Sequence, residues 1–113
     1  MPAPEVLAEQ GSSIEGLDDE MLDLLRTRAA PEPGGVLTGP IARGAADPTL
    51  PKTVVACSFP ESLVHELAGA GVPGFAEMTG PDWSVVELPT GHWPMLSEPV
   101  ALASVLGKVV TGV

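Results

Sequence analysis

Apolar residues recur at helical spacing in the first third of the chain. Four of them lie at positions i, i+4, i+7 and i+8, so they share one helical face: Leu17, Met21, Leu24 and Leu25. Acidic residues open the predicted helix at positions 18–20, and arginines close it at positions 26 and 28, as the helix dipole favours. The pattern predicts a helix that ends at Arg28.

The segments on either side of this helix have no sustained period. Residues 1 to 11 are rich in proline and then polar, and we expect a loop there with at most a turn of helix around Val6 and Leu7. Residues 31 to 52 are rich in proline and glycine, which predicts an extended connector across a surface.

The second half of the chain begins with a predicted strand and a helix. Residues 53 to 57 are uncharged and partly β-branched, which is typical of a strand buried on both faces. Ser58 then has the spacing of a helix N-cap, with Glu61 as the glutamate of its capping box. Glu61 and His65 lie one helical turn apart and are expected to pair. Cys57 is interpreted as a small buried apolar residue.

A further strand and helix complete the sequence pattern. Residues 83 to 88 are predicted to form a second strand, which Pro89 stops. Ser97 is the expected N-cap of a last helix, whose apolar positions at i, i+4 and i+7 are Leu102, Leu106 and Val109.

This order predicts an α/β fold: a βαβα unit over residues 53–113 with two parallel strands, preceded by a helical segment and connector over residues 1–52. Parallel strands are usually covered on both faces and have further neighbours. We therefore expect the unit to be the edge of a larger sheet.

Charge and composition narrow the function. The chain has 15 acidic and 5 basic residues, a net charge of −10, which disfavours nucleic acid and anionic lipid as partners. The acidic bias of residues 1–32 is interpreted as a solvated surface. A single cysteine and the absence of metal-ligand spacings predict no disulfide, metal or cofactor. No apolar run of about twenty residues occurs, so a cytoplasmic protein is expected.

His92 is the residue most suited to chemistry. It follows the second predicted strand, and ligands of open α/β sheets bind beyond the carboxyl ends of the strands. Gly91 permits a tight turn, while Trp93 and Pro94 could shield and stiffen the loop. These residues fit a catalytic histidine and a structural, hydrogen-bonded histidine equally well.

The stretch from Trp83 to Leu106 resembles the C-terminal end of α/β-hydrolases. The features that match are the Gly91-His92 pair after the strand and the Leu-Ser-Glu-Pro sequence that leads into the last helix. In that family a serine, an acid and a histidine follow one another along the chain, and the histidine is the general base. The resemblance implies this role for His92.

The same resemblance assigns roles to other residues. It implies that Glu61 is the candidate triad acid, although a capping-box glutamate explains it as well. Residues 1–52 resemble part of a lid, and Met21, Trp93 and Met95 are then expected to contact the substrate. Plain packing of the helix stripe is the alternative explanation for Met21.

The family's nucleophile motif, Gly-x-Ser-x-Gly, is absent from these residues. Two hypotheses follow. The chain is the C-terminal part of a serine hydrolase for a small ester, amide or related substrate and is inactive alone, or it is a non-catalytic α/β module that assembles with a partner, for example by self-association through an exposed sheet edge.

Overall fold

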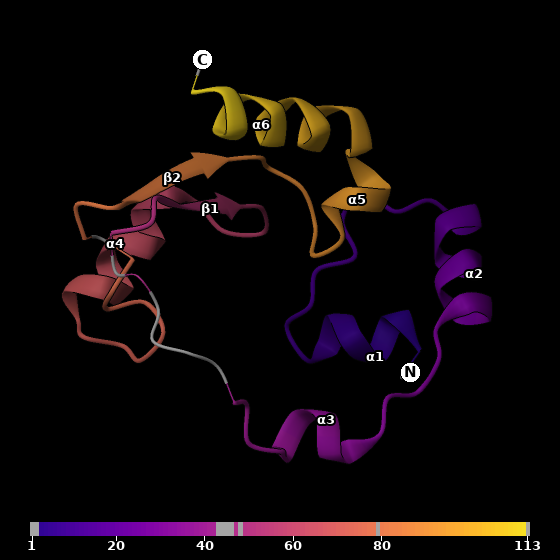
Figure 1. Cartoon of the computed structure of the whole chain (residues 1–113). Coiled ribbons are helices and arrows are strands. Elements are labelled where there is room, and N and C mark those ends of the chain that lie inside the picture. Colours follow the sequence, from indigo (N-terminus) through magenta and orange to yellow (C-terminus); the bar gives the residue numbers. More distant parts are fainter. Residues whose placement is uncertain (1–2, 43–46, 48, 79, 113) are drawn as a thin grey trace.

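The structure, a computed structural model, describes residues 3–42, 47, 49–78 and 80–112. Helices and a small sheet follow one another in the order α1 (Pro4–Glu9), α2 (Asp19–Arg28), α3 (Gly34–Thr38), β1 (Lys52–Ala56), α4 (Glu61–Gly69), β2 (Trp83–Glu87), α5 (Pro94–Ser97) and α6 (Pro99–Thr111). Figure 1 shows α1, α2 and α3 on one side of the molecule and the sheet, with α4 and α6, on the other.

The two strands pair in parallel. Lys52 lies opposite Trp83 at one end of the register, and Ala56 lies opposite Glu87 at the other. Between these ends, the hydroxyl oxygens of Thr53 and Ser84 lie 3.0 Å apart across the strands. Along the chain, α4 lies between the two strands and α6 follows the second one. The predicted mixed α/β class and its two parallel strands are therefore confirmed.

The core lies where α4 meets the sheet. Val64 of α4 is fully buried, and Ala56 and Leu88 are almost fully buried. α4 and α6 lie on opposite sides of the sheet (Figure 1). The expectation that residues 53–57 are buried on both faces is wrong for residues 53–55 and 57, which are half-buried. The physical reason is that two strands present too little area for helices to cover both faces.

The helix predicted from the N-terminal stripe forms as α2. The Asp18 carboxylate accepts a hydrogen bond of 2.8 Å from the backbone N–H of Met21, which makes Asp18 the N-cap. Arg26 in the last turn forms an ion pair with Glu5 of α1. Both side chains are well exposed, so this pair contributes little to stability and serves mainly to connect the two helices.

Three short helices were not expected. Residues 4–9 form α1, because Pro4 stands in the first turn, where its missing N–H costs nothing. The prediction of an extended connector is wrong for Gly34–Thr38, where α3 forms after the N-cap residue Pro33. The Thr38 side chain donates a hydrogen bond to the Gly34 carbonyl within this helix. α5 then precedes α6, and Glu98 takes the N-cap position of α6 that was expected for Ser97.

The molecule exposes far more surface than its mass requires. Its accessible surface is 8033 Å², whereas a compact chain of this mass exposes about 5,800 Å². Its radius of gyration is 16.3 Å, against about 13 Å for a compact domain of this length. The described residues therefore share a small core and leave much apolar surface exposed.

Candidate functional site

The loop that carries His92 is joined to both strands. The backbone N–H of Leu88 donates to the Ala56 carbonyl at 2.9 Å, and that of Thr90 donates to the Cys57 carbonyl at 3.2 Å. The parallel ladder thus continues beyond the ends of β1 and β2. Leu88 and Thr90 are both buried, so the loop leaves the sheet from a fixed point at the carboxyl ends of the strands.

A second segment holds this loop from the N-terminal half of the chain. We call residues 13–16 the N-terminal strap. His92 N–H donates to the Ser13 carbonyl at 2.7 Å, and Gly91 N–H donates to the Glu15 carbonyl at 3.2 Å. Figure 1 shows the chain between α1 and α2 running up beside α5. The two halves of the chain therefore meet through main-chain hydrogen bonds at the candidate catalytic loop.

The contact between strap and loop depends on glycine. A Cβ atom at Gly91 would lie 2.5 Å from the Glu15 carbonyl oxygen and 2.7 Å from that of Ser13. Gly16 has a φ of +80°, and a Cβ there would lie 2.9 Å from the Ser97 Cβ. Both positions have no room for a side chain, and Gly16 also has a backbone conformation that other residues rarely adopt.

Hydroxyl groups fix the other side of the loop. The Oγ atoms of Thr90 and Ser97 lie 2.6 Å apart, and Ser97 also donates to the Trp93 carbonyl at 3.2 Å. Ser97 therefore does not cap α6, as its position had suggested, because its hydroxyl is engaged inside the loop. The hydrogen bonds among Thr90, Trp93 and Ser97 thus stabilise the turn that holds His92.

The His92 side chain is exposed. Its ring lies edge-on to the ring of Trp93, with the centroids 5.0 Å apart and an angle of 74° between the planes. Among the described residues, no hydrogen bond or ion pair involves the His92 ring. The backbone of His92 is thus held by hydrogen bonds, while its ring makes none with the described residues.

Glu61 lies with a different histidine. Its carboxylate is 3.2 Å from Nε2 of His65, which confirms the expected pair one turn apart on α4. The structure does not bring Glu61 to His92. The capping-box explanation of Glu61 is wrong, because the N-cap position belongs to Pro60 and no side chain of the helix caps it.

Glu87 takes the capping role instead. Its carboxylate accepts a hydrogen bond of 2.6 Å from the backbone N–H of Glu61, so the end of β2 caps the start of α4. Sequence reasoning missed this residue. The available signal was the position of Glu87, an acidic residue at the carboxyl end of the second strand of a βαβ unit. The helix that follows the first strand begins beside this end of the sheet, where a negative charge stabilises its N-terminus.

A small cleft lies at this end of the sheet. It has a volume of about 260 Å³ and is mostly apolar. The residues that line it are Ala56, Cys57, Ser58, Phe59, Pro60, Glu87 and Pro89. Phe59 is held by an edge-to-face contact with Phe75, whose ring centroid is 6.4 Å away. His92 is not among the lining residues, so the cleft and the histidine loop are neighbouring but separate features.

The expected substrate contacts do not share one pocket. Met21 lies in an open groove formed by residues of α2 itself, whereas Trp93 is half-buried and Met95 is 54% exposed. A larger apolar groove of about 580 Å³ lies between α2 and α5. It is lined by Leu24, Leu25, Arg28, Ala29 and Leu96. Leu96 was not considered in the sequence analysis, because α5 was not expected.

Cys57 follows β1 and is half-buried. Burial raises the pKa of its thiol, so the reactive thiolate is scarcer than in an exposed cysteine. Its Sγ also lies 3.6 Å from the Val55 carbonyl. These features argue against a nucleophilic cysteine in the cleft.

Alkylation of Cys57 should be slow in the folded chain. At pH 8 we expect iodoacetamide to react with it roughly threefold or more slowly than with the same chain in urea, because burial restricts access and keeps the thiol protonated. Mass spectrometry of quenched samples measures both rates on one protein. Equal rates in the two conditions would contradict the burial of this side chain.

The described ranges contain neither a cluster of metal-ligating side chains nor a membrane-spanning helix. No cluster of three His, Cys, Asp or Glu side chains there could hold a metal ion. No helix in that part of the chain has both the length and the apolar character needed to cross a bilayer. Comparison with protein-family models, with characterised proteins and with solved structures finds no match for this chain.

Proposed function

We propose that this chain is the C-terminal part of an α/β-fold serine hydrolase acting on a small ester, amide or related substrate. His92 is its general base, and the nucleophilic serine lies in a polypeptide segment outside residues 1–113. The observation that carries the proposal is the His92 loop, which follows β2 with a fixed backbone and an exposed ring that has no partner in the described part of the chain.

A general base needs such an arrangement. It takes a proton from the nucleophile and returns it to the leaving group, so its ring must reach the reacting atoms while its backbone stays in place. The hydrogen bonds from Thr90 to Cys57, and from Gly91 and His92 to the N-terminal strap, supply that fixed backbone. A purely structural histidine would be expected to use its ring nitrogens for hydrogen bonds within the loop, and the His92 ring makes none with the described residues.

The triad acid has two candidate sources in this proposal. Glu61 is the candidate in this chain, but its carboxylate faces His65. An acid contributed by the segment that also brings the serine fits the same loop, because the His92 ring is exposed and makes no hydrogen bond with the described residues. In either case the acid would hold the imidazole in one tautomer.

The exposed surface supports a larger assembly. Among the described residues, no further strand pairs with β1 or β2, and the chain has an accessible surface about 2,200 Å² above that of a compact chain. Both features are expected of a sheet that continues elsewhere. In this proposal, α2 belongs to a lid, and the groove beside Leu96 receives the apolar part of the substrate. We also propose a cytoplasmic location and no nucleic-acid partner, in keeping with one unpaired cysteine and a charge of −10.

A fluorophosphonate probe tests the proposal, because it reacts with serines that a general base has activated. We expect no labelling of this chain alone, since no serine here stands in a nucleophile motif. A known serine hydrolase labelled in the same tube is the control. Stoichiometric labelling of the chain that is lost in His92→Ala would overturn the claim that the nucleophile lies elsewhere.

The DNA upstream of the Met1 codon tests the other half of the proposal. We expect an in-frame Gly-x-Ser-x-Gly motif about a hundred residues or more before Met1. A stop codon in that frame, with a start signal directly before Met1, would reject the proposal. Such a stop codon would favour the other function, a non-catalytic module that assembles with a partner. The exposed apolar residues of α6 support that second function.

A further inference from the structure

Hydrogen bonds hold the backbone of His92, but a fixed backbone does not fix its ring. The imidazole turns about two side-chain bonds, and each rotamer places the ring nitrogens at different points. Within the described part of the chain, no hydrogen bond or ion pair holds this ring. A general base must keep one orientation toward its nucleophile, so another kind of contact has to supply it.

The structure gives the His92 ring one aromatic neighbour, Trp93. The centroids of the two rings lie 5.0 Å apart, and their planes meet at 74°. Both values fall in the range that edge-to-face aromatic pairs prefer. The strength of such a pair favours the paired arrangement over separated rings by about two- to tenfold. The indole therefore restricts an imidazole that nothing else described here restricts.

Trp93 is itself anchored, which a restricting side chain must be. Its carbonyl accepts hydrogen bonds from the backbone N–H of Leu96 at 2.9 Å and of Ser97 at 3.1 Å, and from the Ser97 hydroxyl at 3.2 Å. The Ser97 hydroxyl also lies 2.6 Å from that of Thr90, which is buried. Trp93 is thus tied through Ser97 to the buried start of the loop.

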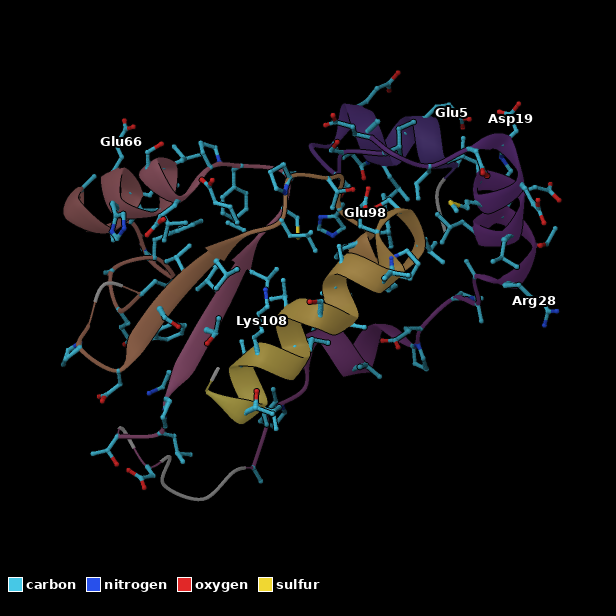
Figure 2. The ribbon with its side chains drawn as sticks, turned by 90° about the horizontal axis from the view of Figure 1, so that it is seen from above. Glu5, Asp19, Arg28, Glu66, Glu98 and Lys108 are labelled. Atoms are coloured by element: carbon cyan, nitrogen blue, oxygen red, sulfur yellow. The ribbon has the colours of Figure 1, made fainter. Side chains whose placement is uncertain are left out.

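The place of α5 adds to this anchoring. Trp93 is the N-cap residue of α5. A Cβ at Gly16 of the strap would lie 2.9 Å from the Ser97 Cβ, and Leu96 lines the groove shared with α2. Figure 2 shows Glu98, which follows α5, on the side of the molecule where α1 and α2 lie. The residue that begins α5 is therefore held relative to both halves of the chain.

A substrate contact was the role that the family resemblance implied for Trp93. Trp93 lines neither the cleft at the carboxyl end of the sheet nor the groove between α2 and α5. It is half-buried, whereas the neighbouring His92 side chain is exposed. The ring contact with His92 therefore favours a role in placing the imidazole over a role in binding substrate.

We propose that Trp93 is a positioning residue, whose indole ring keeps the His92 imidazole in one orientation. The effect on catalysis rests on the proposed hydrolase function, because only there does the ring transfer a proton. The orientation of the ring does not rest on that function and is a property of this chain.

Nuclear magnetic resonance of the 113-residue chain tests the orientation. Three-bond couplings across the Cα–Cβ bond of His92 report its rotamers, and we expect one rotamer to exceed the others about two- to tenfold. Trp93→Ala should abolish this preference, and Trp93→Phe should keep it, because a phenyl ring can form the same edge-to-face contact. The rotamers of His65 on α4 are the internal reference and should stay the same in every variant.

Two controls separate ring placement from damage to the loop. Met95→Ala removes another side chain of α5, one that is 54% exposed, and should leave the His92 rotamers unchanged. Hydrogen exchange of the Gly91 and His92 amides shows whether the backbone contacts with the strap survive in Trp93→Ala. If they do not survive, the wild-type chain decides, since evenly populated His92 rotamers there would overturn the proposal.

Kinetics of the longer polypeptide test the catalytic effect. Trp93→Ala should lower kcat about two- to tenfold with KM unchanged, and Trp93→Phe should restore kcat. A change confined to KM would instead make Trp93 a substrate contact. His92→Ala, measured beside them, separates the two proposals. An inactive His92→Ala with a fully active Trp93→Ala would overturn the positioning role alone, whereas a fully active His92→Ala would overturn the hydrolase function and leave the measured orientation standing.

Discussion

Gly91→Ala is expected to lower the free energy of unfolding by about 3 kcal/mol, close to the limit for a single added methyl group. The new Cβ would lie 2.5 Å from the Glu15 carbonyl oxygen, 2.7 Å from that of Ser13 and 2.9 Å from the Glu15 nitrogen. All three are backbone atoms, so rotation of a side chain cannot relieve the overlap. The strap must move away, and the hydrogen bonds from Gly91 and His92 are then lost.

Urea denaturation followed by circular dichroism measures the change in unfolding free energy. Gly69→Ala at the end of α4 is the matched control, because a Cβ there meets nothing within 4 Å. It should leave stability unchanged or raise it slightly, as alanine is the better helix former. Equal stabilities for the two variants would contradict the close contact between the strap and the loop.

Hydrogen exchange identifies where the damage in Gly91→Ala occurs. The amides of Gly91 and His92 donate to the strap, so both should lose protection, whereas amides in α4 should lose only what the general loss of stability removes. Uniform loss of protection would indicate that the whole fold, and not this contact, depends on Gly91.

The elements that sequence could predict are those with a local pattern. β2 was predicted to within one residue, because a proline marks where the strand must stop. α2 was predicted from its stripe and its acidic start, and Asp18 caps it as a short polar residue should. α1, α3 and α5 have six residues or fewer and thus too few turns to show a period.

The candidate site was only half predictable. The place of His92 after the second strand followed from the order of the elements, because the sequence next to a strand is enough to predict the loop that follows it. The strap did not follow, since it binds through main-chain groups that every residue has. Gly91 was expected to permit a turn, but its lack of a side chain instead makes room for the strap. Ser97 was expected to cap a helix, but its hydroxyl meets Thr90 across the loop.

These contacts connect the two halves of the chain at one functional point. The strap reaches the loop that holds His92, and α2, which follows the strap, lies beside α5 through Leu24, Leu25 and Leu96. A displacement of α2 and the strap would therefore change the position of the His92 backbone. For the proposed hydrolase, substrate binding in the groove beside Leu96 and placement of the general base would depend on the same contacts.

His92→Ala is expected to lower the kcat of the longer polypeptide that the proposed function requires by about 10⁴-fold or more, with a smaller effect on KM. Without the imidazole, nothing takes the proton from the serine, while the oxyanion hole and the binding groove remain. Hydrolysis of a chromogenic ester by the purified longer polypeptide measures both constants, and the fluorophosphonate probe reports loss of serine activation independently of turnover.

His65→Ala is the matched control for this prediction. His65 is the other histidine of the chain, half-exposed on α4 and paired with Glu61. If Glu61 is the triad acid, removing His65 frees its carboxylate and should leave kcat unchanged or raise it, whereas Glu61→Gln should lower kcat steeply. If the acid comes from the segment that brings the serine, both variants should keep full activity while His92→Ala stays inactive. A His92→Ala enzyme with wild-type kcat would remove His92 from the chemistry and leave it a structural residue of the loop.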